Sequence, residues 1–238
     1  MDIHIILIVA LFAVIQSVFG MGLLVFGTPT LLLMGYPFSD VLSILLPPSL
    51  TISLIQMLRQ GRQQKQFAFS LLKFCLPVLI VSLCWTLFSK QKLNFHYIIA
   101  AILLFTAISR YSTRISAFLS RFIENNTRKY LVVMGLVHGM TNMGGSLLST
   151  YAVTRHQLKN EVLGCIVTGY LLFGIVQLGT LHYINALNVS LTTPVTCLVA
   201  GSMFMLVGSR LYNWINEHFY QKVFTLFMLV YAALLIFH

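Results

Sequence analysis

Long apolar runs with almost no charged residue are the feature that most constrains this chain. Four of them are Ile3–Val14, Leu71–Phe88, Tyr97–Ile108 and Phe224–Phe237. Each is long enough to form or dominate a helix in the hydrocarbon core of a bilayer. Only 8% of the residues are charged, whereas a soluble domain carries about 25%. The chain cannot cover a water-facing surface, and we predict an all-α integral membrane protein.

Eight apolar regions divide the chain, at roughly 3–34, 38–58, 67–89, 94–109, 130–153, 160–181, 189–209 and 220–237. The longest polar interval carries Arg110, Arg114, Arg121, Arg128 and Lys129. It separates two nearly equal halves. We therefore predict a first membrane repeat at 1–109, a basic connecting loop at 110–129 and a second membrane repeat at 130–238.

A fixed shift of residue number relates the two halves. Moving by 121 positions places Asp40 on Glu161, Gln56 on Gln177 and Thr28 on Ser149, and it brings Gly20 and Gly22 close to Gly144 and Gly145. Each half then has a Gly-rich segment, an acidic residue, a helix with an internal Gln and two plainer helices. Internal repeats of this kind are common in secondary transporters.

The first apolar region of each half is too long for one simple span. A straight helix of about 30 residues would measure about 45 Å, against a hydrocarbon core of about 30 Å. Gly20 and Gly22 interrupt the first of these regions, and the segment 141–146 interrupts the second. Two alternatives follow: a spanning helix with an overhang, or two half-helices that meet at a break and return to the same side.

The positions of the cations favour the second alternative. If the first region of each half is re-entrant, the loop cations gather on one face, apart from Lys90 and Lys92. If all eight regions span, the cations divide almost evenly. Cytoplasmic loops carry an excess of Lys and Arg. We therefore expect an inverted repeat with three crossings in each half and with its basic loops in the cytoplasm.

The two breaks are the candidate binding site. Half-helices that meet inside a bilayer point free N–H groups, with the positive end of the helix dipole, into one place. Inverted repeats bring two such breaks together at the midplane and would form an anion site without a buried Lys or Arg. The candidate residues at the breaks are Ser17, Gly20, Gly22, Thr28, Thr141, Asn142, Gly144, Gly145 and Ser146. The alternative is that the glycines only allow close helix packing.

Three further polar residues lie inside apolar regions and are candidates for substrate binding. Gln56 and Gln177 occupy equivalent positions, and His138 lies beside the second break. The Gln side chains could equally bond across helices as structural contacts. His138 could bind substrate, carry a proton, or be a packing residue with its hydrogen bonds satisfied.

Several function classes are not expected. The net charge of +10 comes from cations grouped between apolar runs, so nucleic acid is not an expected partner. The four cysteines lie inside apolar runs without metal-ligand spacing, and we expect neither metal nor cofactor. The chain has no ATP-binding P-loop. Ser146 or Ser149 with His138 resembles a nucleophile with a base, but spacing does not establish their geometry. We predict no enzyme and no catalytic residue.

Three stretches resemble one family of membrane permeases. They are the run from Gln16 to Pro29 with Asp40 shortly after, the stretch Gly139–Ser146, and Gly208-Ser-Arg210-Leu before the last apolar region. Together they resemble the TauE/SafE family of sulfite-exporter-like permeases over essentially the whole chain. The chain departs from the family pattern at Gly22-Leu-Leu-Val-Phe-Gly27, where members carry a run of glycines.

The resemblance implies a bacterial inner-membrane transporter of sulfur-containing anions such as sulfite or sulfonates. We therefore expect a secondary transporter or permease for a small anionic substrate, with membrane lipids around it. A channel or a lipid-handling membrane protein is the alternative. The oligomeric state stays open, with a homo-oligomer as one alternative.

Overall fold

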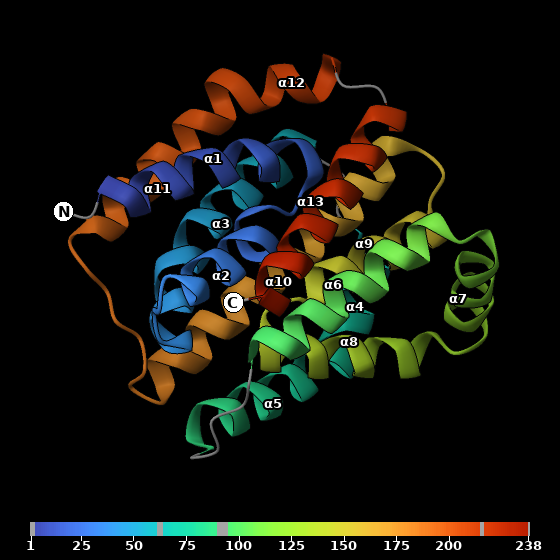
Figure 1. The fold of residues 1–238 in the computed structure, drawn as a ribbon, viewed down its shortest axis with the longest axis horizontal. Coiled ribbons are helices and arrows are strands. Elements are labelled where there is room, and N and C mark those ends of the chain that lie inside the picture. The colour runs from blue at the N-terminus through green and yellow to red at the C-terminus, as the bar shows by residue number, and fades with distance from the viewer. Residues whose placement is uncertain (1–2, 61–63, 90–94, 215–216, 238) are drawn as a thin grey trace. The chain divides into compact units, whose positions relative to one another are not determined.

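The computed structural model describes residues 3–60, 64–89, 95–214 and 217–237 (Figure 1). Within these ranges every regular element is a helix and there is no strand, which confirms the predicted all-α class. The elements are α1 (Ile3–Phe19), α2 (Leu23–Leu33), α3 (Phe38–Gln60), α4 (Lys65–Ser70), the π-helix η1 (Leu71–Cys75), α5 (Leu76–Phe88), α6 (Phe95–Tyr111), α7 (Thr113–Asn125), α8 (Thr127–Thr141), α9 (Gly144–Arg155), α10 (Lys159–Tyr183), α11 (Thr192–Met203), the π-helix η2 (Phe204–Gly208), α12 (Ser209–Trp214) and α13 (Glu217–Phe237). Arg62, Lys90 and Lys92, which entered the charge comparison, lie outside the described residues.

Four described helical stretches are long and apolar enough to cross a membrane. They are Phe38–Arg59, Lys65–Phe88, Lys159–Tyr183 and Thr192–Tyr212. Their lengths of 21 to 25 residues correspond to about 32–38 Å, enough for a hydrocarbon core of about 30 Å. The second and the fourth each contain one of the π-helices. The chain is a multi-pass membrane protein, as the apolar runs predict.

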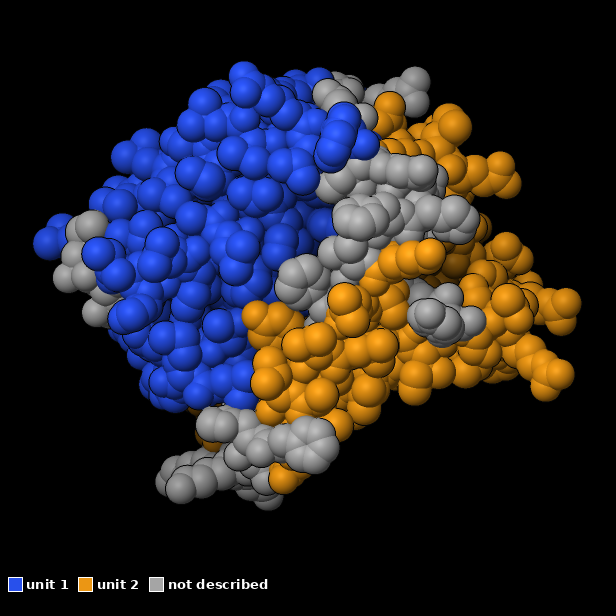
Figure 2. Space-filling view, turned by 45° about the horizontal axis from the view of Figure 1, so that its top comes forward, with its two compact units in different colours: residues 1–68, 163–214 blue, residues 69–162, 215–238 orange. Residues whose placement is uncertain are grey.

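The chain forms two compact units (Figure 2). Unit 1 consists of residues 1–68 and 163–214, and unit 2 of residues 69–162 and 215–238. Each unit takes helices from both halves of the sequence. The compact units therefore do not follow the predicted repeats at 1–109 and 130–238, and that division stays a prediction about internal symmetry.

Unit 1 packs α1 against α2, α3 and α11, and α3 against α2 and α11. Its core contains Phe26, Tyr170 and Phe173, whose side chains are almost fully buried. Close approach needs a small residue at Gly208 in η2, because a Cβ atom there would lie 2.1 Å from the Cβ of Ser17. This spacing lets η2 lie directly against the last turns of α1.

Unit 2 packs α8 against η1 and α5, and α6 against α13. The α8 contact depends on two glycines one turn apart. A Cβ at Gly135 would lie 2.3 Å from the carbonyl oxygen of Cys75, and one at Gly139 would lie 2.5 Å from that of Leu79. Ser82 also donates its hydroxyl to the Gly135 carbonyl at 3.3 Å. Small residues that allow backbones to touch are typical of helix pairs in membranes.

The interval 110–129 differs from the connecting loop that the sequence suggested, because it contains the helix α7. Ser112 caps this helix by accepting a hydrogen bond from the Ile115 N–H at 3.4 Å. Ile115, Leu119 and Ile123 recur every four residues and so share one face, whereas Arg114 and Arg121 are exposed. The loop was predicted from the cations of this interval, and the spacing of its apolar residues was not used. α7 packs against α6, α8 and α9 within unit 2.

Candidate functional site

The first apolar region folds back on itself at the predicted break. α1 ends at Phe19, Gly20 has the left-handed φ of 72°, and α2 begins at Leu23. The rings of Phe12 in α1 and Phe26 in α2 lie 6.1 Å apart. In one straight helix these residues would be about 21 Å apart. α1 and α2 are therefore the two arms of a hairpin, hereafter the first hairpin.

The second apolar region folds back in the same way. The Tyr130 hydroxyl in α8 donates to the Leu147 carbonyl in α9 at 2.7 Å, across 17 residues that would span about 25 Å in a straight helix. Farther from the break, the rings of Tyr130 and Tyr151 stack at 6.3 Å, and Arg155 donates to the hydroxyl of Thr127. α8 and α9 form the second hairpin. The alternative of a continuous helix is wrong for both regions.

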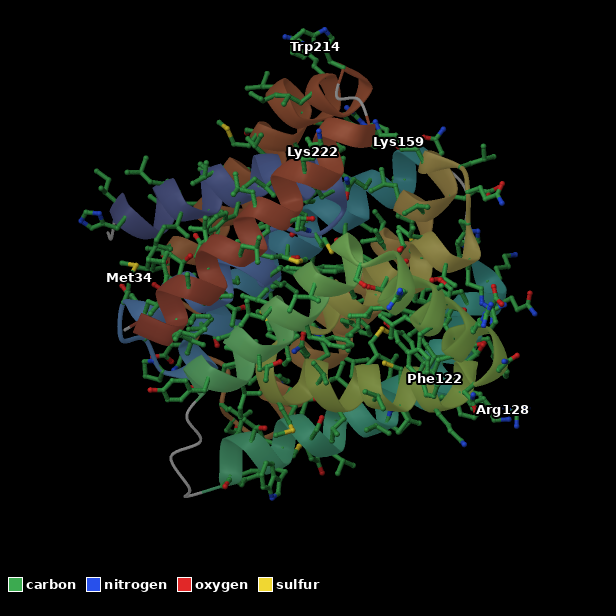
Figure 3. The ribbon with its side chains drawn as sticks, turned by 45° about the vertical axis from the view of Figure 1, so that its right-hand side comes forward. Met34, Phe122, Arg128, Lys159, Trp214 and Lys222 are labelled. Atoms are coloured by element: carbon green, nitrogen blue, oxygen red, sulfur yellow. The ribbon has the colours of Figure 1, made fainter. Side chains whose placement is uncertain are left out.

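The second hairpin also explains the distribution of cations in its own unit. Arg128 and Lys129 begin α8 and Arg155 ends α9, so the fold-back brings all three to one end of the hairpin. Figure 3 labels Arg128 near Phe122 of α7. A continuous helix would have placed these cations at opposite ends.

A contact within unit 1 agrees with the re-entrant arrangement. Asn188 donates its side-chain amide to Asp40 at 2.5 Å and its backbone N–H to Ser43 at 3.1 Å. The start of α3 and the loop before α11 are therefore at the same end of unit 1. The re-entrant arrangement requires this, whereas eight spanning regions would put them on opposite faces. The inverted relation between the two halves stays a prediction.

Each break is closed by a buried polar side chain from the last turns of its first arm. Gln16 accepts a hydrogen bond from the Leu23 N–H at 3.2 Å, at the start of α2. His138 Nδ1 accepts one from the Gly144 N–H at 3.1 Å, at the start of α9. Both side chains satisfy a helix-terminal donor that water cannot reach.

The two breaks share a left-handed residue and the backbone hydrogen bond that precedes it. The Gln16 carbonyl accepts from the Gly20 N–H at 2.7 Å, and the His138 carbonyl accepts from the Asn142 N–H at 2.8 Å. Gly20 and Asn142 are both left-handed, with φ of 72° and 62°. Both pairs are 122 positions apart, one more than the shift of 121 used on the sequence. This shared local geometry supports a common origin for the two halves.

Gln16 is a site residue that the sequence reasoning missed. Its amide also donates to the Ser49 carbonyl at 2.9 Å and to the hydroxyls of Ser49 and Ser53 at 3.0 and 3.3 Å. The available signal was a Gln four residues before a glycine in an apolar run. Its counterpart in the second half is a His at a local shift of 122, so the two residues do not match by identity.

The glycines at the start of each second arm are required by packing. A Cβ atom at Gly22 would lie 2.4 Å from the backbone nitrogen of Gln16. One at Gly144 would lie 2.4 Å from the Cβ of His138. These contacts give the packing alternative a physical basis at both positions. The same glycines also leave the backbone N–H groups at these positions accessible to a ligand, because glycine has no side chain.

The other candidates of the first half lie in unit 1. Gln56 in α3 donates to the Ser17 carbonyl at 3.0 Å, so it is joined to the last turn of α1. The Ser17 hydroxyl donates to the Ala13 carbonyl at 2.6 Å. Thr28 is fully buried in α2. Gln177 is fully buried in α10, also within unit 1, whereas the second break belongs to unit 2.

The candidates of the second half surround the second break. The Thr141 hydroxyl accepts from the Met143 N–H at 3.2 Å and donates to the Val137 carbonyl at 2.7 Å. The Ser146 hydroxyl donates to the Met143 carbonyl at 2.8 Å. Asn142 and Gly145 are buried beside them. The structure thus brings His138, Thr141 and Ser146 together around one helix start.

Both breaks have the character of neutral, protected polar sites. Every candidate residue is buried, and none of them is Asp, Glu, Lys or Arg. Hydroxyls and side-chain amides can donate to an anion. The start of α9, a helix of 12 residues, adds the positive end of its dipole. Anion binding at the breaks stays a prediction.

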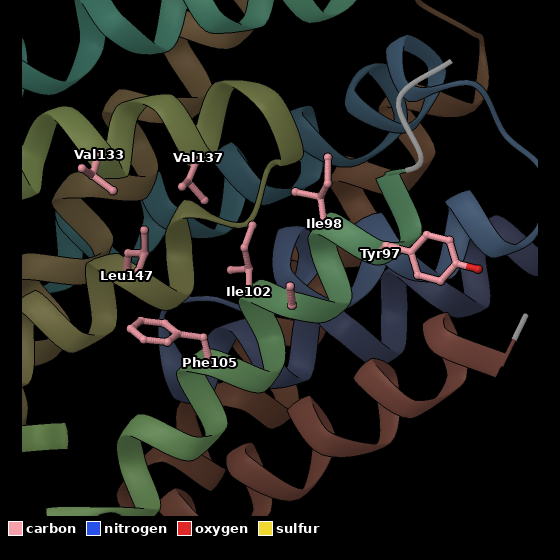
Figure 4. Close-up of a pocket in the computed structure, with 8 residues that line it drawn as sticks. Tyr97, Ile98, Ile102, Phe105, Val133, Val137 and Leu147 are labelled. Carbon is pink, nitrogen blue, oxygen red and sulfur yellow. The ribbon is translucent and has the colours of Figure 1, made fainter. Parts of the chain in front are cut away.

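Unit 2 also contains a groove whose lining is apolar, unlike the polar breaks. A groove of 540 Å³ lies between α6 and the second hairpin (Figure 4). Val133, Val137 and Leu147 line one side and Ile98, Ile102 and Phe105 the other, so the lining is apolar. A groove with no polar group to replace hydration is unsuited to an anion. Membrane lipids as partners of the chain stay a prediction.

Comparison with protein families gives a match over nearly the whole chain. The family described as Sulfite exporter TauE/SafE matches residues 5–235. No curated protein and no solved structure matches the chain. The family match covers both hairpins and all four candidate membrane spans. It implies a membrane transporter for sulfur-related anions, and members of this family are transporters rather than enzymes. The chain belongs to the sulfite exporter TauE/SafE family.

Proposed function

We propose that this protein is a secondary transporter that moves a small sulfur-containing anion, such as sulfite or a sulfonate, across the bacterial inner membrane. Family membership supports the transport of sulfur-related anions. In this proposal the basic end of the second hairpin faces the cytoplasm, in keeping with the bias of Lys and Arg toward cytoplasmic loops.

The observation that carries the proposal is the closure of each break by a neutral side chain. Gln16 and His138 accept hydrogen bonds from the N–H groups of Leu23 and Gly144. Rotation of such a side chain frees a backbone donor at a helix start, where negative charge is favoured. The anion then takes the place of the cap, so the helix start is never left unpaired in the membrane.

Donors near the second break fit the chemistry of an oxyanion. The Thr141 and Ser146 hydroxyls now donate to backbone carbonyls. Either hydroxyl can rotate toward a ligand oxygen at the cost of one neutral hydrogen bond, and a bond to a charged oxygen is roughly twice as strong. The absence of Lys and Arg among the candidate residues favours release, because binding stays weak enough for turnover.

Binding at protected breaks is compatible with a carrier rather than an open pore. In this proposal the anion is exposed to one side at a time through movement of one half of the transporter against the other. A channel is the competing reading. The two differ in whether substrate on the far side accelerates exchange.

The test is transport by the purified protein in liposomes. We expect saturable uptake of radiolabelled sulfite or of methanesulfonate, accelerated by unlabelled substrate inside the vesicles. The controls are empty liposomes and the Gly179→Ala variant, because nothing lies within 4 Å of a Cβ atom at Gly179. Saturable uptake without acceleration would support a channel. Uptake no faster than in empty liposomes, for every sulfur oxyanion and sulfonate tested, would refute the proposed function.

A further inference from the structure

The second arm of the second hairpin carries a row of hydroxyl groups. Ser146, Thr150 and Thr154 follow one another every four residues along α9 and so lie on one stripe of the helix. Thr150 donates to the Ser146 carbonyl at 3.1 Å, and Thr154 donates to the Thr150 carbonyl at 2.9 Å. Ser146 is fully buried at the break, whereas Thr150 and Thr154 are half-buried. The row leads from the break toward the basic end of the hairpin.

A polar cavity lies beside the outer part of this row. Its volume is 130 Å³, and it is lined by Thr150, Thr154 and Val153 of α9, Ser116, Leu119 and Ser120 of α7, and Ser109 of α6. Five of these seven residues carry hydroxyls, in contrast to the apolar groove in Figure 4. The hydroxyls of Ser120 and Thr154 face each other at 3.5 Å.

The hydroxyls of the cavity keep acceptor sites for water, although Thr150 also bonds to the Tyr130 side chain and Ser120 pairs with Thr154. Those of Ser109, Thr150 and Thr154 donate to carbonyls of their own helices. Each hydroxyl oxygen has two acceptor sites besides its single donor. At about 30 Å³ for each water, the cavity has room for about four molecules. Water in this cavity would hydrogen-bond to the five hydroxyl groups that line it.

Charge at the outer end of the row favours anions. Arg155 follows Thr154 directly, is exposed, and is held by its hydrogen bond to Thr127 and by the ring of Tyr151, whose centre lies 5.9 Å from the guanidinium carbon. A cation held next to Thr154 raises the local concentration of anions there. The end of the row next to Arg155 is therefore positively charged, whereas the hydroxyl groups of the row itself are neutral and polar.

We propose that Ser146, Thr150 and Thr154, with Ser109, Ser116 and Ser120 opposite, form the hydrated passage by which the anion moves between the second break and the face that carries α7. The passage rests on the proposed function for the identity of its cargo. α7 supplies one wall of it. Along the row, a hydrated oxyanion exchanges its hydrogen bonds with water for hydrogen bonds from the hydroxyl groups. The first fixed charge that it meets is that of Arg155.

Accessibility of single cysteines tests the passage. Ser146, Thr150 and Thr154 are replaced by Cys one at a time, in a protein that lacks the four native cysteines. Leu148→Cys and Ala152→Cys are the matched controls, because both residues are fully buried on the other side of α9. The reagent is the anionic, membrane-impermeant sulfonatoethyl methanethiosulfonate, applied to oriented vesicles from the α7 side and from the opposite side.

We expect labelling from the α7 side at Thr154→Cys, then Thr150→Cys, then most slowly at Ser146→Cys, with none at the two controls. Modification of Thr150→Cys should abolish most of the transport, and free sulfite should slow its labelling. Labelling at Thr154→Cys alone would show a dead-end cavity and overturn the passage. Full labelling of Thr150→Cys with unchanged transport would overturn it as the route of the anion.

The outcome separates this inference from the proposed function. If the protein with its native cysteines transports no sulfur-containing anion, the proposed function fails, and the labelling pattern still reports whether the row is hydrated. If transport is normal but none of the three positions is labelled from the α7 side, the passage fails while the function stands. Thr150→Val, which keeps the shape and removes the hydroxyl, should slow transport by about tenfold, the effect of one hydrogen bond to a charged group.

Discussion

His138 and Gly144 are joined by a hydrogen bond of 3.1 Å from the backbone N–H of Gly144 to Nδ1 of His138, across the break between α8 and α9. The contact explains two features together. It satisfies a helix-terminal donor inside the membrane, and it holds the first turn of α9 so close to α8 that only glycine fits.

Removing the His138 cap should destabilise the protein. His138→Ala leaves the buried Gly144 N–H without its acceptor, which costs about 1–3 kcal/mol. His138→Gln should retain most of the stability, because the side-chain carbonyl of Gln16 performs the same role at the first break. Thermal unfolding in detergent measures both variants. Equal melting temperatures for His138→Ala and the unchanged protein would show that the cap contributes nothing.

Substitution of Gly144 should impair folding and not only binding. The added Cβ in Gly144→Ala would lie 2.4 Å from the Cβ of His138, and such overpacking costs about 1–3 kcal/mol or more. Gly179→Ala is the matched control, since its Cβ meets no atom within 4 Å. Size-exclusion profiles of fluorescent fusions compare the folded yields. A Gly144→Ala yield equal to that of Gly179→Ala would contradict the packing.

Asn142 allows backbone conformation to be separated from ligand binding. Its φ of 62° is left-handed, which glycine adopts freely and a β-branched residue strongly resists. Asn142→Val should lower stability by about 1–2 kcal/mol. Asn142→Gly should fold well but transport poorly if the side-chain amide binds the anion. Normal transport by Asn142→Gly would limit the role of Asn142 to the turn.

Gln16 should be the most sensitive polar residue of the first hairpin. Its side chain is hydrogen-bonded to Leu23, Ser49 and Ser53. Gln16→Leu keeps the size and leaves buried polar groups unpaired in α2 and α3, at about 1–3 kcal/mol for each group that finds no other partner. Gln16→His is the control that imitates the second break. The melting temperature of Gln16→Leu should fall well below that of Gln16→His, and the reverse order would contradict the correspondence of the two breaks.

The breaks were predictable from the sequence because their causes are local. Gly20, Gly22 and the segment 141–146 interrupt apolar runs that are too long for one span, and the distribution of cations favours a return to the same side. The helix class follows from the same apolar runs. These signals depend on composition and spacing within a few turns.

The closure of the breaks and the cavity beside α7 depend on contacts that the sequence alone does not specify. Gln16 and His138 share a role but not an identity, so a comparison of identical residues did not pair them, and Gln16 was not among the candidates. The sequence did not lead to a prediction of α7, because its cations suggested a loop. Ile115, Leu119 and Ile123 nevertheless have the spacing of an amphipathic helix. The row at Ser146, Thr150 and Thr154 has helical spacing too, but only the facing serines of α6 and α7 give it a cavity.

The re-entrant hairpins are the central claim, and cysteine accessibility from each side of the membrane tests them most directly. Met34→Cys, Gln157→Cys and Tyr183→Cys place exposed probes after the first hairpin, after the second hairpin and before α11. In a background without the native cysteines, we predict that Met34→Cys and Tyr183→Cys are labelled from outside and Gln157→Cys only from inside. Labelling of Met34→Cys and Gln157→Cys from one face, with Tyr183→Cys on the other, would contradict the hairpins and the anion site built on them.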